Sequence, residues 1–225
     1  MSHALPLFTY IYNKSRNTMK KEISPNDSTR AEAYQLWMTS PMPMVTLTKT
    51  FNITNIHRIS KSNNLKLNML LCWCIGKAAT QTKEFYTLPE DGKLFQYDTL
   101  AINVIVNNSK GGINSCDIPY TDNIEEFNKN YLALTQQAQE NCISIFKEED
   151  MIIGTSAMTA TELDSIINQY TDKFCNPMLM WGKYRKKIFK TTLAISFQFH
   201  HVQMDGGHAA HFLETLQKTI NTITA

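Results

Sequence analysis

The segment 191–216 changes its hydrophobic pattern once along its length, and this change restricts the possible folds more than any other feature. Residues 191–200 are rich in β-branched and aromatic side chains, which is typical of a β-strand. From His208 onward the apolar side chains recur with the spacing of one helical face, at Phe212, Leu213 and Leu216. The sequence therefore predicts a strand that leads through a short turn into a helix.

The turn between this strand and this helix carries side chains that suit acid–base chemistry. His200 and His201 end the strand, and Asp205 follows after three residues, directly before two glycines. Glycine permits backbone angles that other residues avoid, and a nearby carboxylate can fix the orientation of a base. Two interpretations are open at this point, since a histidine pair at a strand end is often purely structural.

A metal site at the same turn is a further alternative. His208 and His211 lie three residues apart on the predicted helix and could share a face with His200 or His201. No cysteine or carboxylate partner set has the ligand spacing of a zinc site, so we expect no metal.

Composition favours a single globular domain without a nucleic-acid partner. The chain has 225 residues, of which 43% are hydrophobic and 19% charged, and this suits one domain with a sizeable core. Its formal net charge is +2, so no overall field would attract nucleic acid. Basic residues do cluster in the segment 183–187, which is either a solvated strand end or a local anion site.

The cysteines and the N-terminus favour a cytoplasmic protein. The five cysteines are scattered and lack the spacing of redox or zinc motifs, so we expect reduced thiols. Residues 5–12 are apolar, but this run is too short to span a bilayer and no basic segment precedes it, so we expect no membrane partner. Met19 is a second possible start, and we assign residues 1–24 to an N-terminal extension and 25–225 to the domain.

The rest of the chain alternates predicted helices and strands and shows no repeat or linker. Ser28 can cap a first helix, and the longest apolar helix candidate, 67–81, should be buried. Helices are predicted at 29–38, 53–60, 67–81, 123–141 and 161–170, the last of them alternatively an irregular turn, and strands at 45–51, 93–97, 100–106, 113–118, 151–156, 177–181 and 188–200. This pattern predicts one mixed α/β domain, in which 100–106 and 113–118 pair as a hairpin.

The His-His-x-x-x-Asp-Gly pattern resembles that of the chloramphenicol acetyltransferase family and, more broadly, of the CoA-dependent acyltransferases that include dihydrolipoyl transacetylase cores. Matching positions follow in order across residues 25–220, at Arg30, the strand 45–53, Lys66, the Cys–Pro–Tyr stretch 116–120 with its two inserted residues, Ser156 before an alanine, and the pair 183–184. The resemblance implies an α+β sandwich, in which helices flank a mixed β-sheet, and a homotrimer with active sites between subunits.

The resemblance also implies a reaction and the residues that carry it. An acetyl group would pass from acetyl-CoA to a hydroxyl of a small molecule such as chloramphenicol, as in antibiotic resistance. His201 would be the general base, and Ser156 would donate to the oxyanion. Asp205 and Arg30 would form a buried ion pair that holds the turn. CoA would be contacted by Lys66, Lys183 and Tyr184.

Departures from the family pattern concern the acceptor pocket. Trp37 and Val45, with two prolines between them, stand where the family has aromatic and small apolar residues. Ile105 stands in place of the phenylalanine of a Phe-His pair, and Met180 stands in place of a threonine. We expect all four side chains to contact the acceptor, which need not be chloramphenicol.

Two rival function classes are open. A lipoyl-linked transacetylase core would share the scaffold, but such cores come with lipoyl and subunit-binding modules that we do not find in these residues. A non-catalytic relative would use the trimer for binding alone, and the presence of His201, Ser156 and Asp205 argues against it.

Overall fold

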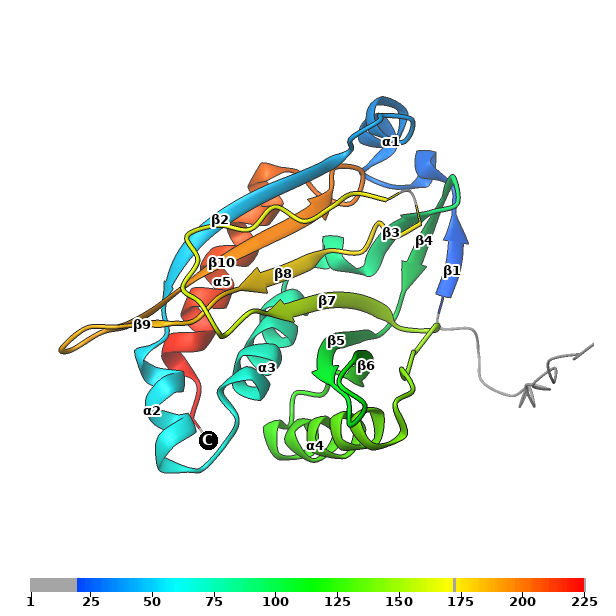
Figure 1. The fold of residues 1–225 in the computed structure, drawn as a ribbon. Helices are drawn as coiled ribbons and strands as arrows, with labels where there is room; N and C mark the ends of the chain where they lie inside the picture. Colours follow the sequence, from blue (N-terminus) through cyan, green and yellow to red (C-terminus); the bar gives the residue numbers. More distant parts are fainter. Residues whose placement is uncertain (1–19, 172, 225) are drawn as a thin grey trace, which may run out of the picture.

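The computed structural model describes residues 20–171 and 173–224, and a seven-stranded mixed sheet forms its centre. The strands of this sheet are β2 (Met44–Asn52), β5 (Leu100–Asn107), β6 (Ile113–Pro119), β7 (Met151–Ala157), β8 (Met178–Trp181), β9 (Arg185–Lys186) and β10 (Thr191–His200). They follow the order β2-β10-β8-β7-β5-β6, with β9 paired to β10 (Figure 1). β7 runs parallel to β5 and β8, and the other neighbours run antiparallel, so the predicted mixed sheet and the predicted β5–β6 hairpin are confirmed.

A second, three-stranded sheet joins the start of the described chain to the middle of the sequence. It consists of β1 (Lys20–Ile23), β4 (Lys93–Tyr97) and β3 (Thr87–Glu90), with β4 between the other two. β1 lies within the range assigned above to an N-terminal extension, yet all four of its residues pair with β4. The apolar run 5–12 and Met19 lie outside the described residues.

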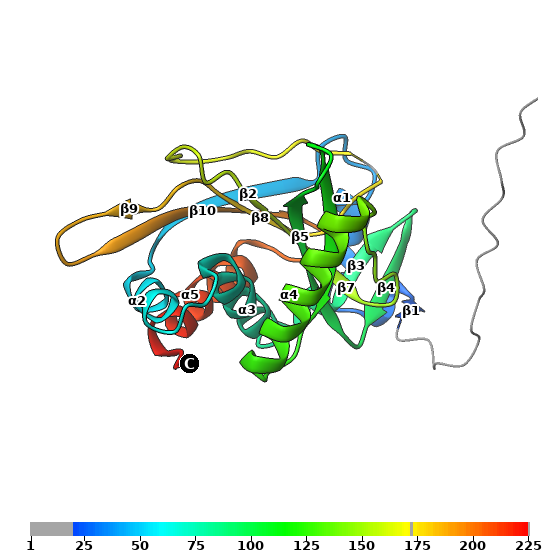
Figure 2. The ribbon, with the colours of Figure 1, turned by 60° about the horizontal axis from the view of Figure 1, so that its bottom comes forward.

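The main helices pack on one face of the large sheet (Figure 2). They are α2 (Thr54–Ser62), α3 (Leu67–Ala79), α4 (Ile124–Asn141) and α5 (Gly206–Thr222), while α1 (Ala31–Trp37), η1 (Pro25–Asp27) and η2 (Lys83–Tyr86) are short. The core lies between these helices and the sheet, where Phe197 of β10 contacts Phe212 of α5 with ring centroids 4.8 Å apart. α3 is buried on nearly all sides, as its sequence predicts. None of the helices in the described ranges is long and apolar enough to cross a bilayer.

An irregular segment, residues 158–171, covers part of the other face of the sheet. Of the two interpretations of 161–170, the helix is wrong, because the segment is irregular and its backbone forms hydrogen bonds with side chains of the sheet. The Ile166 N–H donates to Ser196 Oγ at 2.8 Å, and Gln198 Nε2 donates to the Asn168 carbonyl at 3.1 Å. The sheet therefore carries helices on one face and extended chain on the other.

Candidate active site

One arginine, Arg30, holds the turn between the end of strand β10 and the start of helix α5. The Arg30 side chain is buried and donates three hydrogen bonds to the turn: to the carbonyls of His201 (2.8 Å) and Val202 (2.9 Å) and to Asp205 Oδ2 (3.2 Å). The His201 N–H donates in turn to the Pro43 carbonyl at 2.8 Å, just ahead of β2. The backbone on both sides of the His201 side chain is therefore fixed by hydrogen bonds.

The His201 imidazole lies flat against Trp37, the last residue of α1. The two ring centroids are 4.7 Å apart and the ring planes differ by 6°. The Nδ1 atom of His201 is buried, and no residue in the described part of the chain gives it a hydrogen-bond partner. The stack therefore limits rotation of an imidazole whose Nδ1 atom is enclosed by the protein. We call Arg30, Trp37, His201 and Asp205 the base cluster.

Asp205 caps the first turn of α5 in addition to forming an ion pair with Arg30. Its Oδ1 accepts from the N–H groups of Gly207 (3.0 Å) and His208 (3.3 Å), which are free donors at a helix start. Burial raises the pKa of Asp205, but the His208 N–H, the His208 charge, the Gly207 N–H and Arg30 together lower it below its ordinary value. The Asp205 side chain is 44% exposed and that of Arg30 is 10% exposed. The ion pair is thus buried on its arginine side alone, whereas the family resemblance implies a buried pair.

His208 extends this network to a buried carboxylate. Its Nδ1 accepts from the Asp205 N–H at 3.3 Å and completes a capping box, and its Nε2 lies 3.4 Å from Glu84 Oε1. The sequence indicated His208 only as a possible metal ligand, although its position three residues after Asp205 is the spacing of a capping box. Within the described ranges, no group of three or more His, Cys, Asp and Glu side chains could hold a metal ion.

His200 has a structural environment that differs from that of His201. It is almost fully buried, and its Nδ1 accepts from the Val202 N–H at 3.1 Å. Burial, followed by the charge of His201, lowers the pKa of His200 to about 4. His200 is therefore neutral near neutral pH and supports the turn from inside.

Ser156 lies on β7, on the face of the sheet that carries no helices. It pairs in register with Met180 of β8, and Met180 pairs with Ser196 of β10. The last pair of the parallel β5–β7 ladder is Asn103 with Gly154. Two residues further along both strands, Ile105 therefore lies beside Ser156. Met180 is buried and Ile105 is 41% exposed. We call Ile105, Ser156 and Met180 the serine row.

The base cluster and the serine row are far apart within one chain. Ser196 lies two strands from Ser156 and five residues before His201. Strands lie about 4.8 Å apart and rise about 3.3 Å per residue, so two strands and five residues place the Cα atoms of Ser156 and His201 roughly 19 Å apart. Neither side chain is long enough to cross this distance, so a single chain does not bring the two together.

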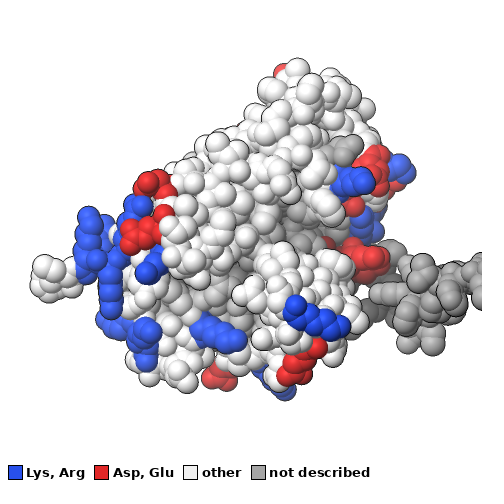
Figure 3. Space-filling model, viewed as in Figure 1, with Lys and Arg blue, Asp and Glu red and all other residues white. Residues whose placement is uncertain are grey.

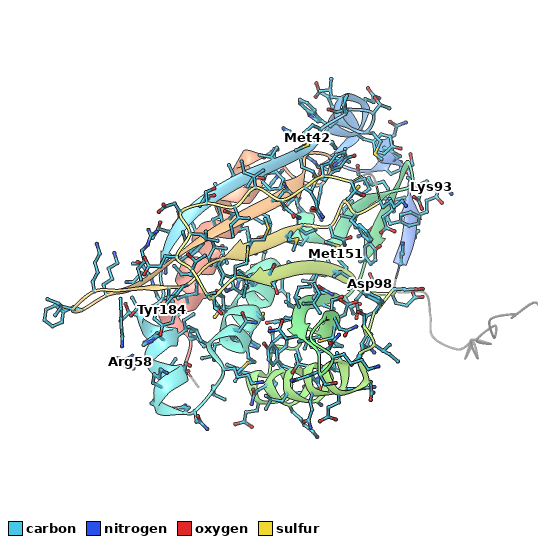
Figure 4. The ribbon with its side chains drawn as sticks, in the orientation of Figure 1. Met42, Arg58, Lys93, Asp98, Met151 and Tyr184 are labelled. Atoms are coloured by element: carbon cyan, nitrogen blue, oxygen red, sulfur yellow. The ribbon has the colours of Figure 1, made fainter. Side chains whose placement is uncertain are left out.

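The remaining candidates lie in other places. Val45 pairs with Phe199 and packs against the core on the helical face, away from Ser156. Tyr184 meets the ring of His57 edge-on at 5.0 Å, beside α2, and Lys183 next to it is exposed. Lys66, at the start of α3, places its Nζ 5.9 Å from the centroid of the Tyr131 ring. Figure 4 shows Tyr184 near Arg58 at the end of the sheet that is remote from Met42.

Comparison with known proteins identifies the family of the chain. A family model for chloramphenicol acetyltransferase matches residues 20–217. Chloramphenicol acetyltransferase 3 of Escherichia coli is 24% identical over 183 residues, which are 78% of this chain and 85% of that protein. The Bacillus pumilus chloramphenicol acetyltransferase is also 24% identical, over 88% of this chain and 92% of that protein.

Solved structures show the same fold. A chloramphenicol acetyltransferase superposes with a TM-score of 0.78 at 18% identity, over 90% of this chain and 100% of that chain. The catalytic core of a 2-oxoacid dehydrogenase multienzyme complex from Thermoplasma acidophilum gives a TM-score of 0.66 at 16% identity, over 88% of this chain and 96% of that chain. Because the family model spans nearly the whole described chain, this protein is an acyltransferase and belongs to the chloramphenicol acetyltransferase family.

Proposed function

We propose that the protein transfers an acetyl group from acetyl-CoA to a hydroxyl group of a small molecule, with His201 as the general base. The observation that supports this assignment most is the restraint on His201. Trp37 stacks on its ring, and Arg30 holds its carbonyl. An imidazole that is held in place is well suited to remove a proton from a hydroxyl, which is the usual role of histidine as a general base.

In the proposed reaction, the hydroxyl oxygen of the acceptor attacks the thioester carbon of acetyl-CoA while His201 takes the hydroxyl proton. Since Nδ1 is enclosed, we assign this role to Nε2. The resulting tetrahedral oxyanion accepts a hydrogen bond from Ser156. In comparable enzymes one such donor lowers the reaction barrier by about 3 kcal/mol. The carbon–sulfur bond then breaks, and His201 returns the proton to the CoA thiolate, leaving an acetyl ester and free CoA.

This reaction requires two copies of the chain at each site. His201 and Ser156 are roughly 19 Å apart within one chain by strand geometry, so the base cluster of one subunit would face the serine row of another. A homotrimer, as the family resemblance implies, is our proposal for the assembly. Its sites would lie between subunits, with the acceptor between Trp37 and the serine row.

Acetyl-CoA would approach from the end of the molecule that carries Lys183 and Tyr184. Lys66, Lys183 and Tyr184 are our candidates for its phosphates and adenine, and Tyr184 has one side of its ring against His57. The five cysteines are scattered and four of them are buried, which fits the reducing cytoplasm that we propose as the location. The acceptor is chloramphenicol or another small hydroxyl compound, and antibiotic resistance is the corresponding role.

The test is release of the CoA thiol from acetyl-CoA, measured with chloramphenicol and with a panel of small hydroxyl compounds. Wild type, His201→Ala and His211→Ala would be compared, because His211 is an exposed histidine on α5 outside the base cluster. We expect His201→Ala to lower the rate about 10³-fold, a typical loss for a general base, and His211→Ala to leave it unchanged.

A His201→Ala rate equal to that of wild type would overturn the assignment of the base. If no acceptor releases CoA, a thermal shift with CoA decides between two outcomes. A clear shift supports a CoA-dependent enzyme with an untested acceptor, and no shift contradicts the proposed use of acetyl-CoA.

A further inference from the structure

The β9–β10 hairpin projects from the body of the protein (Figure 1), and two apolar residues form its tip. Lys187 and Lys190 close its loop with mutual backbone hydrogen bonds, from the Lys187 N–H at 2.8 Å and from the Lys190 N–H at 3.4 Å. Ile188 and Phe189 form the loop and are 90% and 93% exposed. They are the two most exposed large hydrophobic side chains of the described residues.

Local folding does not explain this pair. Two-residue hairpin loops favour Gly, Asn and Asp, because these residues adopt the required backbone angles most easily. Ile188 and Phe189 provide no such advantage, and at their exposure they add almost no packing to the protein. Exposed apolar side chains that serve neither the turn nor the core indicate contact with another apolar phase.

The surface around the tip is basic. Lys186, Lys187 and Lys190 are exposed on the hairpin itself. The adjoining helix α2 contributes Lys61. The pKa of His57 is lowered mainly by burial, and next by the positive charges of Lys186 and Lys61, so both lysines lie near this histidine. Figure 3 shows Lys and Arg side chains gathered at this end of the molecule, with uncharged atoms protruding beyond them.

Acidic residues near the hairpin are few and already paired. The sequence contains no Asp or Glu between Asp172 and Asp205 and none between Glu32 and Glu84, so neither the hairpin nor α2 carries an acid. Glu162 lies at the base of the hairpin, where it pairs with Arg185 at 3.1 Å. Asp164 pairs with the same guanidinium at 2.8 Å. The lysines nearer the tip therefore present net positive charge to the solvent.

We propose that this hairpin docks the enzyme on an anionic lipid surface, with Ile188 and Phe189 inserted at the level of the headgroups and Lys186, Lys187 and Lys190 bound to lipid phosphates. An apolar tip surrounded by lysines is complementary to such a surface in both polarity and charge. A second copy of the hairpin is a poor occupant, since the lysines of two hairpins would repel each other. Soluble phosphate compounds such as CoA would use the lysines but not the apolar tip.

This proposal revises the expectation of no membrane partner. That expectation rested on the absence of an apolar segment long enough to span a bilayer, and a hairpin tip needs no such segment. The docking surface shares no residue with the base cluster, the serine row or the CoA candidates Lys66, Lys183 and Tyr184, although the last two lie directly before its hairpin in the sequence.

The experiment is co-sedimentation of the full chain with vesicles of phosphatidylcholine containing phosphatidylglycerol, and with vesicles of phosphatidylcholine alone. The variants are the double substitution Ile188→Ser with Phe189→Ser, and the triple substitution of Lys186, Lys187 and Lys190 by Gln. Ile113→Ser is the matched control, since Ile113 is also an exposed apolar residue, 68% exposed, on the separate β5–β6 hairpin. At such exposed positions we expect all variants to fold, which a thermal melt would check.

Wild type and Ile113→Ser should partition onto the anionic vesicles and not onto neutral ones, less strongly as salt is raised. The Ser variant should bind at least about tenfold more weakly, because two inserted apolar side chains are lost. The Gln variant should bind about 100-fold more weakly, at about fivefold for each lysine. Equal binding of wild type and both variants, or no binding of wild type, would overturn the proposal.

A sedimentation-velocity comparison of wild type and the Ser variant without vesicles completes the test. An unchanged oligomeric state supports a lipid partner for the tip. Dissociation of the Ser variant would show that Ile188 and Phe189 contact another subunit, and it would contradict the proposal. The CoA-release assay is read separately, so the loss of docking and the loss of the proposed chemistry remain distinguishable.

Discussion

Arg30 illustrates how one buried side chain can hold the turn between β10 and α5. Its guanidinium satisfies two backbone carbonyls and one carboxylate, and only 9% of the residue is exposed. Asp205 reaches solvent and is also satisfied by the first turn of α5. The two partners of this ion pair should therefore contribute unequally to stability, since an exposed charge keeps most of its hydration.

This asymmetry gives the first prediction at the residue scale. Arg30→Met should lower the free energy of unfolding by about 3 kcal/mol, because the His201 and Val202 carbonyls lose their partner. Asp205→Asn should lower it by about 1 kcal/mol, because Asn caps a helix nearly as well as Asp and only the exposed side of the ion pair is lost. Urea unfolding of both variants measures this difference, and equal losses would contradict it.

His200 gives a pH dependence whose sign follows from its lowered pKa. In the unfolded chain this histidine takes up a proton near its ordinary pKa of about 6.5, whereas in the folded chain it does so only near a pKa of about 4. Between these values the unfolded state binds more protons, so stability falls as the pH falls. From pH 7 to pH 5 the loss due to His200 should be about 2 kcal/mol.

Urea unfolding of wild type and His200→Asn at pH 7 and pH 5 measures this effect. Asn can still accept from the Val202 N–H but does not titrate, so the variant should lose about 2 kcal/mol less than wild type on acidification. Asp205, whose pKa lies below its ordinary value, stays ionised across this range in both proteins. The same pH slope in both proteins would contradict the prediction.

At the scale of elements, the sequence predicts those segments whose structure is determined locally. The β5–β6 hairpin has strong strand residues on both sides of a turn, and α3 is apolar on most sides, so both are confirmed. β1 and β3 were missed because each is short and gains its stability from β4. The helix at 161–170 is wrong because Ser196 and Gln198, more than 25 residues away, capture its backbone groups.

The irregular segment 158–171 passes close to the backbone of Gly182, the residue that follows β8. A Cβ at Gly182 would lie 2.7 Å from the Thr161 carbonyl oxygen and 2.9 Å from the Leu163 nitrogen, both of them backbone atoms. Gly182→Ala should therefore lower the free energy of unfolding by about 2 kcal/mol, since backbone must move. Gly206→Ala is the matched control, because nothing lies within 4 Å of its Cβ position at the start of α5.

Thermal or urea unfolding of the two variants distinguishes these cases. Gly206→Ala should be neutral or slightly stabilising, since alanine is the better helix former. If Gly182→Ala unfolds at the same denaturant concentration as wild type, the segment 158–171 does not pack as closely on β8 in solution.

At the scale of the whole molecule, the sequence predicts the family but not the geometry of its site. The order of motifs along the chain indicated His201 and Ser156 as candidate site residues. The linear sequence does not show that the sheet holds them far apart. Only the strand register reveals this, because β7 and β10 are separated by β8 and the two residues lie at different heights along the sheet. The contact of Trp37 with His201 was also not foreseen, since Trp37 was expected to touch the acceptor.

The final prediction uses this separation. If each site takes His201 from one subunit and Ser156 from its neighbour, His201→Ala and Ser156→Ala should be nearly inactive alone and partly active in mixed trimers. Random assembly of equal amounts places both functional residues at about a quarter of the interfaces, so about a quarter of the wild-type rate should return. The measurement is CoA release after the two variants are unfolded and refolded together.

Two folded variants that are mixed without refolding serve as the control, because their subunits stay in separate trimers and should show no recovery. Recovery only after joint refolding would locate His201 and Ser156 on different subunits of one site. No recovery in either mixture, with both variants folded and trimeric, would mean that each site draws both residues from one chain. Since strand register keeps them roughly 19 Å apart there, Ser156 would then lose its assignment as the donor to the oxyanion.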